Sequence, residues 1–529
     1  MPDRSGRSGI VENLIVGSGL AGIATAMALR ARGAPFEVLD VGYDLDPLTG
    51  ESAAQLSRLD PQSWDGHTSE RLFPQPVTSA SGVQRRLLFG SDFPYRIPEP
   101  LSVRMENCTT ELSHGLGGFG NVWGAAMLPY SAHTLRDWPI PKNELDQSYR
   151  NVLKYVPLSA EKDGLEHIFP IHTERATVID RSRQIEALLN AFNRRKDRLA
   201  RQGVEFGRAR VAVNSTGTAR GCRYCGMCLD GCVYGSIFNP RLLWNELEKM
   251  EKLIHRGFYA LEFKEHDDHA LVTAVSTDDG SIRQWRAKRI FLASGHFATA
   301  RMIARSLGRF NETIRVPDSQ YFFFPLLSYR AVREEVRFSL ADMFLEILNT
   351  EISDDYLHFQ LYGMNRIFQQ TLRAMIPRPI PTSAIASRFY MFQGYLHSAD
   401  SGHLELEVIA AGEKHDEVII RGVDNPRALA VARKVQALLR KSLITFGLIP
   451  PIYLKLVPPG RSFHTGGSFP IGGSHVVYSS DILGRPAGLK RVHIVDSANF
   501  PTVASSTIGY TIMANADRIV RACADLAMD

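Results

Sequence analysis

The succession of short, mostly apolar segments near the N-terminus predicts a strand, a helix and a second strand. Residues 11–16 (VENLIV) end in an apolar run, residues 23–31 are small and alanine-rich, and residues 36–40 (FEVLD) are again mostly apolar. A helix between two buried strands is typical of a parallel βαβ unit. We therefore expect the opening of a doubly wound sheet with the first strand at its centre.

The middle of the chain continues this mixture of helices and strands. Several short strands are expected between residues 254 and 292, and the last of them leads through Gly295 into a helix that ends near Leu307. Helical periodicity recurs in three segments, at 143–155, 182–201 and 240–252.

Composition changes near residue 310, after which apolar and aromatic strands dominate. The turn residues 398–402 (SADSG) separate two of these strands and predict a hairpin. These two strands are expected at 389–397 and 403–408, and the segment 321–329 is apolar and aromatic. The predicted fold class is α/β, with two domains. A Rossmann-like domain is formed by 1–309 and 456–529 and is therefore discontinuous, and an α+β domain with a mostly antiparallel sheet is formed by 310–455.

Composition and charge exclude several classes of function. Of the 529 residues, 44% are hydrophobic and 22% are charged, as in ordinary globular proteins. The net charge of +5 is spread along the chain without a basic block, so we expect no nucleic-acid partner. The N-terminal segment is polar and no apolar run is long enough to span a membrane, which favours a cytoplasmic protein.

A glycine-rich loop between the first strand and the first helix predicts a dinucleotide site. Its glycines allow a tight turn, a close approach of the backbone to a pyrophosphate, and close packing of helix on strand. Asp40 ends the second strand, where a carboxylate accepts from a ribose hydroxyl. The alternative is a purely structural turn, and the motif alone does not separate FAD from NAD. The loop consists of Gly17, Ser18, Gly19, Leu20, Ala21 and Gly22.

Several further motifs occur in an order that resembles the glucose–methanol–choline (GMC) oxidoreductase family. They are His464-Thr465-Gly466-Gly467, the segment 492–502 (VHIVDSANFPT), 137–140 (DWPI), the second glycine loop 115–124 (GLGGFGNVWG), and Ala293-Ser294-Gly295. The resemblance implies an FAD-binding domain, a substrate domain at 310–455, and oxidation of an alcohol by hydride transfer to flavin N5. His464 is then the base that takes the hydroxyl proton.

The same resemblance implies which other residues contact FAD. Val122 stands where some relatives have the histidine that attaches FAD covalently, so we expect non-covalent FAD. The backbone N–H groups of Ile508 and Gly509 are expected to face flavin O2. The remaining cofactor-binding residues are Gly117, Gly118, Asn121, Trp123, Gly295 and Asp496.

One position departs from the family pattern. Thr507 stands in the segment after the FPT motif, where the family usually has a second histidine or an asparagine. A threonine hydroxyl forms hydrogen bonds but is no base at neutral pH. We therefore expect Thr507 to support His464 at the catalytic site.

A cysteine-rich insertion at 221–235 adds a second candidate cofactor. The spacing C-x2-C-x2-C-x3-C is that of bacterial ferredoxins, although a valine replaces their following proline. The alternatives are a zinc site and free or disulfide-bonded thiols. An iron–sulfur cluster here would pass single electrons from the flavin to an external carrier, as the resemblance to cluster-bearing GMC sugar dehydrogenases implies. The cysteines are Cys222, Cys225, Cys228 and Cys232.

An apolar face made by residues such as Phe368 and Ile376 predicts a helix that packs on its own domain, and contact with a membrane surface is the less favoured alternative.

The predicted function is a dehydrogenase that oxidises a sugar or another alcohol. Alternatives are an O2-using oxidase with structural cysteines and a flavin electron-transfer or redox-sensing protein without alcohol chemistry.

Overall fold

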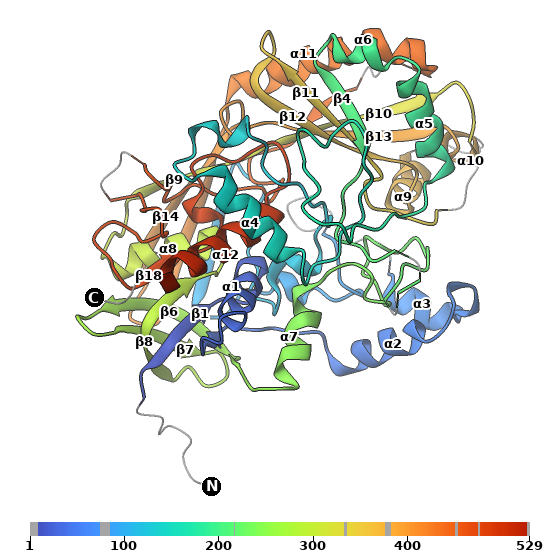
Figure 1. The fold of residues 1–529 in the computed structure, drawn as a ribbon. Coiled ribbons are helices and arrows are strands. Elements are labelled where there is room, and N and C mark those ends of the chain that lie inside the picture. Colours follow the sequence, from blue (N-terminus) through green and yellow to red (C-terminus); the bar gives the residue numbers. More distant parts are fainter. Residues whose placement is uncertain are drawn as a thin grey trace.

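The computed structural model describes residues 9–74, 85–215, 217–218, 220–332, 336–375, 382–449, 453–473 and 477–525. Its described strands form three sheets (Figure 1). The first sheet holds the N-terminal βαβ unit. Its strands, in spatial order, are β5 (Ile254–His255), β2 (Glu37–Leu39), β1 (Val11–Val16), β8 (Ile282–Leu292), β7 (Ala270–Ser276) and β6 (Phe258–Glu265), with β18 (Val492–Ile494) also paired to β8.

Strand β1 lies inside this sheet and pairs in parallel with both β2 and β8. Its side chains alternate between two apolar cores, as expected for a strand covered on both faces. Ile15 packs in the core that includes α1 (Leu20–Arg30) and α12 (Gly509–Asp525). Leu14 and Val16 pack in the opposite core together with α8 (His296–Ser306).

The second sheet is antiparallel and lies in the upper part of Figure 1. One of its faces packs against α5 (Arg183–Asn193), α6 (Lys196–Ala200) and α11 (Pro426–Leu443) in a single apolar core. The periodicity predicted at 182–201 thus forms two helices. The strands, in spatial order, are β16 (Leu448–Ile449), β10 (Tyr321–Ser328), β13 (Phe389–Tyr395), β12 (Ser353–Tyr362), β11 (Met343–Asn349) and β4 (Val204–Arg208), with β17 (Lys455–Leu456) also paired to β10.

The period of two along these strands gives the second sheet two different faces. Phe322, Phe359 and Phe392 belong to the core under the helices. Their neighbours in sequence point the other way and are more polar. Tyr321 and Tyr395 form a cross-strand pair, and Tyr395 is in turn paired with His358 of β12.

The third sheet corrects the predicted hairpin at 398–402. Strand β13 pairs with β10 and β12, whereas the strand that follows it pairs only within the third sheet, so residues 398–402 cross from one sheet to another. Pairing also crosses the predicted boundaries of the 310–455 domain, because β4 joins the second sheet and β3 joins the third. The third sheet consists of β3 (Leu101–Glu106), β15 (Asp416–Val423), β14 (His403–Ala410) and β9 (Thr313–Pro317).

The remaining helices lie around these sheets. The predicted amphipathic segment forms α9 (Arg366–Met375), in which the ring of Phe368 packs against Phe389, with centroids 5.4 Å apart. Ile376 of that segment lies outside the described residues. None of the helices in the described residues is long and apolar enough to cross a membrane. The other helices are α2 (Pro47–Ser57), α3 (Gly66–Leu72), α4 (Lys142–Val152), α7 (Pro240–Glu248) and α10 (Thr382–Ala386).

Candidate active site

A cavity of about 400 Å³ lies between the first and second sheets. The glycine loop after β1 and the end of β2 form part of its wall, and the second glycine loop forms another part. The segment 461–465, the first turn of α12 and the polar face of the second sheet also contribute. Segments from both ends of the chain therefore meet around one space.

The loop after β1 has the geometry that its glycines predict. Gly17 has a φ of +105°, and its N–H donates to the carbonyl of Leu39 at 2.9 Å. A Cβ atom on Gly22 would lie 2.1 Å from the Gly17 carbonyl oxygen, so only glycine allows this approach of helix to strand. A Cβ atom on Gly19 would meet no atom within 4 Å, which leaves the space beside α1 open to a ligand.

Asp40 lies at the end of β2 and lines the cavity. Its carboxylate accepts a hydrogen bond from the N–H of Gly42 at 2.7 Å. Burial raises the pKa of Asp40 to about 6, although the hydrogen bonds from Ser18 and Gly42 oppose this shift. The carboxylate is thus available as an acceptor at neutral pH, as a ribose hydroxyl requires.

The second glycine loop is fastened to the first. Gly117 donates its N–H to the hydroxyl of Ser18 at 2.9 Å, and Gly118 faces Gly19, so that a Cβ atom on Gly118 would lie 3.3 Å from the Gly19 Cα. Trp123 donates from its indole N–H to the Phe238 carbonyl at 2.9 Å, which fixes its ring at the cavity wall.

His464 faces the cavity from a tightly held loop. Its Nδ1 atom is buried without a hydrogen-bond partner among the described residues. Burial, and to a lesser extent the nearby His358, lowers the pKa of His464 to about 3. The imidazole is therefore neutral at physiological pH and can accept a proton.

A buried carboxyl group fastens the loop of His464. Asp318 is fully buried and accepts from the N–H of Gly460 at 2.7 Å and from the hydroxyl of Ser462 at 2.9 Å. The Ser462 hydroxyl in turn accepts from the N–H of His464 at 3.0 Å. Burial raises the pKa of Asp318 to about 7. This carboxyl group thus positions the backbone of His464 without reaching the cavity.

Thr507 and Ile508 lie where α12 begins. The Thr507 hydroxyl donates to the carbonyl of Ala126 at 3.1 Å, so its proton is already engaged, and Thr507 lines the cavity. Ile508 and Gly509 line the same part of the wall. The first N–H groups of a helix have no partner within it, and the N-terminus of α12 therefore offers hydrogen-bond donors and positive potential to a ligand.

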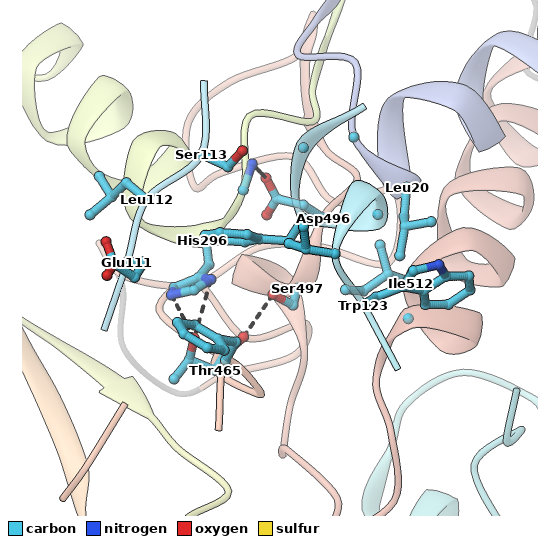
Figure 2. A pocket seen from close by; sticks show the side chains of 18 of the residues that line it. Leu20, Glu111, Leu112, Ser113, Trp123, His296, Thr465, Asp496, Ser497 and Ile512 are labelled. Atoms are coloured by element: carbon cyan, nitrogen blue, oxygen red, sulfur yellow. Dashed lines mark hydrogen bonds between the residues drawn. The ribbon is translucent and has the colours of Figure 1, made fainter. Parts of the chain in front are cut away.

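Asp496 lines the cavity and is shown in Figure 2. Its carboxylate accepts from the N–H of Gly295 at 3.0 Å and from the Thr299 hydroxyl at 2.5 Å. Burial raises the pKa of Asp496 to about 6. The structure thus gives Asp496 the role of holding the turn between β8 and α8, in addition to its place at the cavity wall.

Most of the predicted site residues come together here. Three of the predicted cofactor-binding residues lie outside the wall: Gly22 packs on Gly17, Gly117 bonds to Ser18, and the Asn121 side chain donates to the carbonyls of Leu116 and Gly118. The predicted residues that line the cavity are Gly17, Ser18, Gly19, Leu20, Ala21, Asp40, Gly118, Val122, Trp123, Gly295, His464, Asp496, Thr507 and Ile508. Their roles remain predictions.

Several cavity residues were missed from the sequence. His296 is hydrogen bonded through Nε2 to the Thr465 hydroxyl at 2.7 Å, and Figure 2 shows the pair beside Ser497. The polar face of the second sheet was missed too, although the alternation in 358–362 (HFQLY) is a visible signal for it. The further wall residues are Arg85, Arg86, Tyr95, Glu111, Tyr321, Gln360, Tyr362, Gln393, Tyr395, Arg461 and Phe463.

The four clustered cysteines lie in a loop behind the second glycine loop. A separate cavity of about 320 Å³ is lined by Cys228 and Cys232 and by Val122 and Trp123, so the two segments are neighbours. All six cysteines of the chain are free thiols. Within the described residues, no three side chains of the ligand types are arranged to hold a metal ion. The placement of the cysteines therefore gives the predicted cluster no support.

The fold is that of a known oxidase. The chain is similar to the crystal structure of pyridoxine 4-oxidase from Mesorbium loti, with a TM-score of 0.60 over 98% of this chain and 100% of that one. The sequences are only 14% identical, so this similarity concerns the fold. It supports the mixed α/β fold class expected from the sequence. No protein-family model matches the chain, and no curated protein sequence does so.

Proposed function

We propose that the protein is an FAD-dependent oxidoreductase that oxidises an alcohol to a carbonyl compound, with His464 as the base. The observation that carries the proposal is a single cavity joining the glycine loop and Asp40 to His464 and Thr507. The shared fold with an enzyme named as an oxidase supports it. A dinucleotide needs the first group of residues, and proton removal needs the second.

The residues of the cavity fit a flavin dinucleotide. The open space beside Gly19, faced by Gly118, accommodates a phosphate close to the backbone. The first turn of α1 supplies N–H groups there, and the Asp40 carboxylate accepts from a ribose hydroxyl. Trp123 and the N-terminus of α12 line another part of the same cavity, which suits an extended ligand whose ring system lies beside them.

When bound, FAD supplies a two-electron acceptor for the hydride that leaves the substrate carbon. His464 takes the hydroxyl proton, because its neutral imidazole has a free lone pair at physiological pH. A base of such low pKa forms no free alkoxide, so proton removal accompanies departure of the hydride. Asp318 holds the His464 backbone in place through Ser462 during this step.

Thr507 acts on substrate position rather than on the proton. Its hydroxyl proton is donated to Ala126, so the oxygen offers lone pairs and no acid or base function. Helix α12 begins at Gly509, and its N-terminus adds positive potential to the cavity. This potential would stabilise the negative charge that the cofactor gains when the alcohol is oxidised.

The observations favour O2 as the final electron acceptor of the proposed reaction. The solved neighbour is named an oxidase, and the four cysteines as placed do not form a ligand set for a cluster. The dehydrogenase with an iron–sulfur relay, expected from the cysteine spacing, has no support from their placement. The sugar substrate expected from the sequence stays a prediction.

Anaerobic reduction of the flavin by alcohols tests this function. Protein purified with FAD is mixed with a panel of primary and secondary alcohols, and bleaching near 450 nm is followed. At least one alcohol should bleach the wild-type flavin. His464→Ala should keep its flavin but reduce it at least ~100-fold more slowly, as expected for loss of a general base.

A matched control and two further readouts complete the test. His403→Gln changes an equivalent side chain on β14, outside the cavity wall, and should behave as the wild type. In air, one hydrogen peroxide per carbonyl formed identifies O2 as the acceptor. Fast flavin reduction by His464→Ala would remove this residue as the base, and a flavin that no alcohol bleaches would favour an electron-transfer or sensor protein.

A further inference from the structure

One wall of the cavity is polar but carries no charge of its own. It is formed by the face of β10, β12 and β13 that points away from the helix-covered core. Amides and phenols on this wall can bind a substrate by hydrogen bonds and ring contacts. The side chains are Tyr321, Gln360, Tyr362, Gln393 and Tyr395.

Two arginines reach the same corner from other segments. Arg86 and Arg461 both line the cavity, and the guanidinium carbon of Arg461 lies 5.4 Å from the ring centre of Phe463, next to His464 in sequence. The positive charges of both arginines act on Tyr321 and Tyr395, opposing the rise in pKa that burial causes. Both guanidinium groups therefore approach the tyrosines that form the wall.

Arg86 differs from its neighbour Arg85 in having no acidic partner among the described residues. Arg85 forms a two-pronged ion pair with Glu111, with N–O distances of 2.8 and 3.0 Å. In the part of the chain that the structure describes, no carboxylate forms an ion pair with Arg86. Asp230 is near enough for Arg86 to lower its pKa, but the ion pair of Asp230 is with Arg366.

A partly buried guanidinium without an acid leaves a positive charge in the cavity. Arg86 is half-buried. Burial raises the pKa of Tyr362, and the charge of Arg86 and its hydrogen bond with Tyr362 oppose this rise. Removing a cation from water without a counter-charge is costly, and an anionic ligand would offset that cost. The planar fork of arginine binds carboxylate and phosphate in a two-pronged geometry.

We propose that the substrate is an alcohol carrying an oxyanion, which Arg86, assisted by Arg461, binds while the hydroxyl group reaches His464. The inference rests on the proposed alcohol oxidation and adds the substrate class, a hydroxylated organic acid or a phosphorylated alcohol. The tyrosines of the sheet face contact the body of the substrate between these two ends. Charge recognition at one end fixes which carbon faces the base at the other.

Binding of unreactive analogues to the FAD-loaded protein tests the charge requirement apart from catalysis. Calorimetry compares 4-methylbenzoate and 4-methylphenyl phosphate with the neutral 4-methylbenzamide. The wild type should bind at least one anion roughly 10- to 100-fold more tightly than the amide, as expected for hydrogen bonds to a charged group. The tighter of the two anions identifies the oxyanion as carboxylate or phosphate. Equal binding of all three would overturn the proposal.

Variants assign this preference to Arg86. Arg86→Gln should lose the preference for the anion, bind the amide unchanged and keep its flavin, whereas Arg86→Lys should retain part of the preference. Arg96→Gln is the matched control, because Arg96 is exposed and paired with Asp92 on the surface. A preference that survives Arg86→Gln overturns the assignment. Loss of flavin in Arg86→Gln with the preference intact would place Arg86 on a cofactor phosphate and also overturn it.

Flavin reduction by matched alcohols separates this inference from the function on which it rests. 4-(Hydroxymethyl)benzoate should bleach the flavin with a kcat/KM roughly 10- to 100-fold above that of 4-(hydroxymethyl)benzamide. If the amide bleaches it as well as the acid, alcohol oxidation stands and the anion requirement fails. If neither does, while the anionic analogue still binds more tightly than the amide, the anion site stands and the proposed oxidation fails.

Discussion

The imidazole of His464 stacks on the ring of Tyr395, with centroids 5.1 Å apart and planes inclined by 25°. Tyr395 belongs to β13 in the second sheet, whereas His464 belongs to the segment that returns to the first. This contact therefore places the proposed base, His464, against the sheet face that is proposed to bind the substrate. The orientation of His464 depends on it, because Nδ1 has no partner among the described residues.

Replacing Tyr395 by leucine should slow the proposed reaction. The variant loses an aromatic contact of about 0.5–1.5 kcal/mol and leaves His464 free to rotate, so flavin reduction should fall roughly 3- to 10-fold. Tyr395→Phe keeps the ring and should stay within about 2-fold of the wild type. Stopped-flow measurements give the rate of flavin reduction in both variants. A leucine variant that reduces its flavin as fast as the wild type would contradict a positioning role for Tyr395.

A buried acid–imidazole pair lies next to Tyr395 in the same sheet. Glu346 of β11 and His358 of β12 are a register pair, both essentially inaccessible, with an N–O distance of 2.5 Å. Burial raises the pKa of Glu346, while His358 opposes the shift. Glu346→Leu should cost about 3–5 kcal/mol of unfolding free energy, because it leaves the imidazole without its partner.

The double variant Glu346→Leu/His358→Leu should recover much of that loss, since neither polar group is then left unpaired. Urea unfolding of the wild type, both single variants and the double variant gives the coupling energy directly. Additive losses in the double variant would show that the two side chains act independently.

Two glycines of the first loop should respond in opposite ways to substitution. A Cβ atom on Gly22 would lie 2.1 Å from the Gly17 carbonyl, so Gly22→Ala should lower the melting temperature of the apoprotein by several degrees. Gly19 has ordinary backbone angles and open space around it, so Gly19→Val should leave the apoprotein stable. The valine fills the space proposed for a phosphate, and bound flavin should fall at least ~10-fold.

Thermal melts of the flavin-free proteins and the flavin content after purification distinguish these outcomes. Full flavin content in Gly19→Val would place the cofactor elsewhere. Normal stability of Gly22→Ala would mean that α1 shifts away from Gly17 at little cost.

The N-terminal unit was predictable because its signals are local. The strand at 11–16, the loop and the helix follow one another directly, and the same residues that form β1 also decide that it is buried on both faces. The expected centre of the sheet follows from this pattern, and the pairing of β1 with β2 and β8 agrees with it.

The hairpin at 398–402 was wrong because turn composition does not identify the partner of a strand. Those residues look like a solvent-exposed turn, yet Asp400 is buried and accepts from Ser353 in the second sheet. Arg427, at the start of α11, is its ion-pair partner. The polar turn residues therefore join two sheets, and only contacts distant in sequence decide this.

The candidate site was predictable as far as its motifs reach. His464, Thr507 and Asp40 stand in recognisable segments, whereas Arg86 and Asp318 carry no local signal. These two residues gain their meaning from what the fold places beside them. A side chain at an alternate strand position faces either the core or the cavity, and the sequence alone does not say which face is covered.

Three of the clustered cysteines, Cys222, Cys225 and Cys228, should behave as protonated thiols that react slowly. Burial raises the pKa of Cys222 to about 12 and also raises the pKa of Cys225 and Cys228, so little thiolate exists at pH 8. Titration with a disulfide reagent should be slow in the native protein and reach six thiols after denaturation. Iron and acid-labile sulfide are measured on the same anaerobic sample, and about four of each per chain would contradict this arrangement.

Acid should destabilise the protein partly through His493. This imidazole is buried, contacts the Leu483 carbonyl at 3.0 Å and has its pKa lowered to about 4, chiefly by burial. Its folded pKa lies below the value near 6.5 of an unfolded chain, so on unfolding it takes up a proton below pH 6.5. The stability it contributes is therefore full above about pH 6.5 and is lost progressively as the pH falls to about 4.

The variant His493→Leu removes this linkage while keeping an apolar side chain on β18. Between pH 7.5 and pH 5, the wild type should lose roughly 1–2 kcal/mol more unfolding free energy than the variant. Urea unfolding at both pH values measures the difference, and the absolute stability of the variant does not enter it. His67→Leu changes an exposed histidine of α3 and should follow the wild type. Parallel losses in the wild type and His493→Leu would mean that the pKa of this imidazole is the same in the folded and the unfolded protein, because only a difference between the two pKa values couples unfolding to proton uptake.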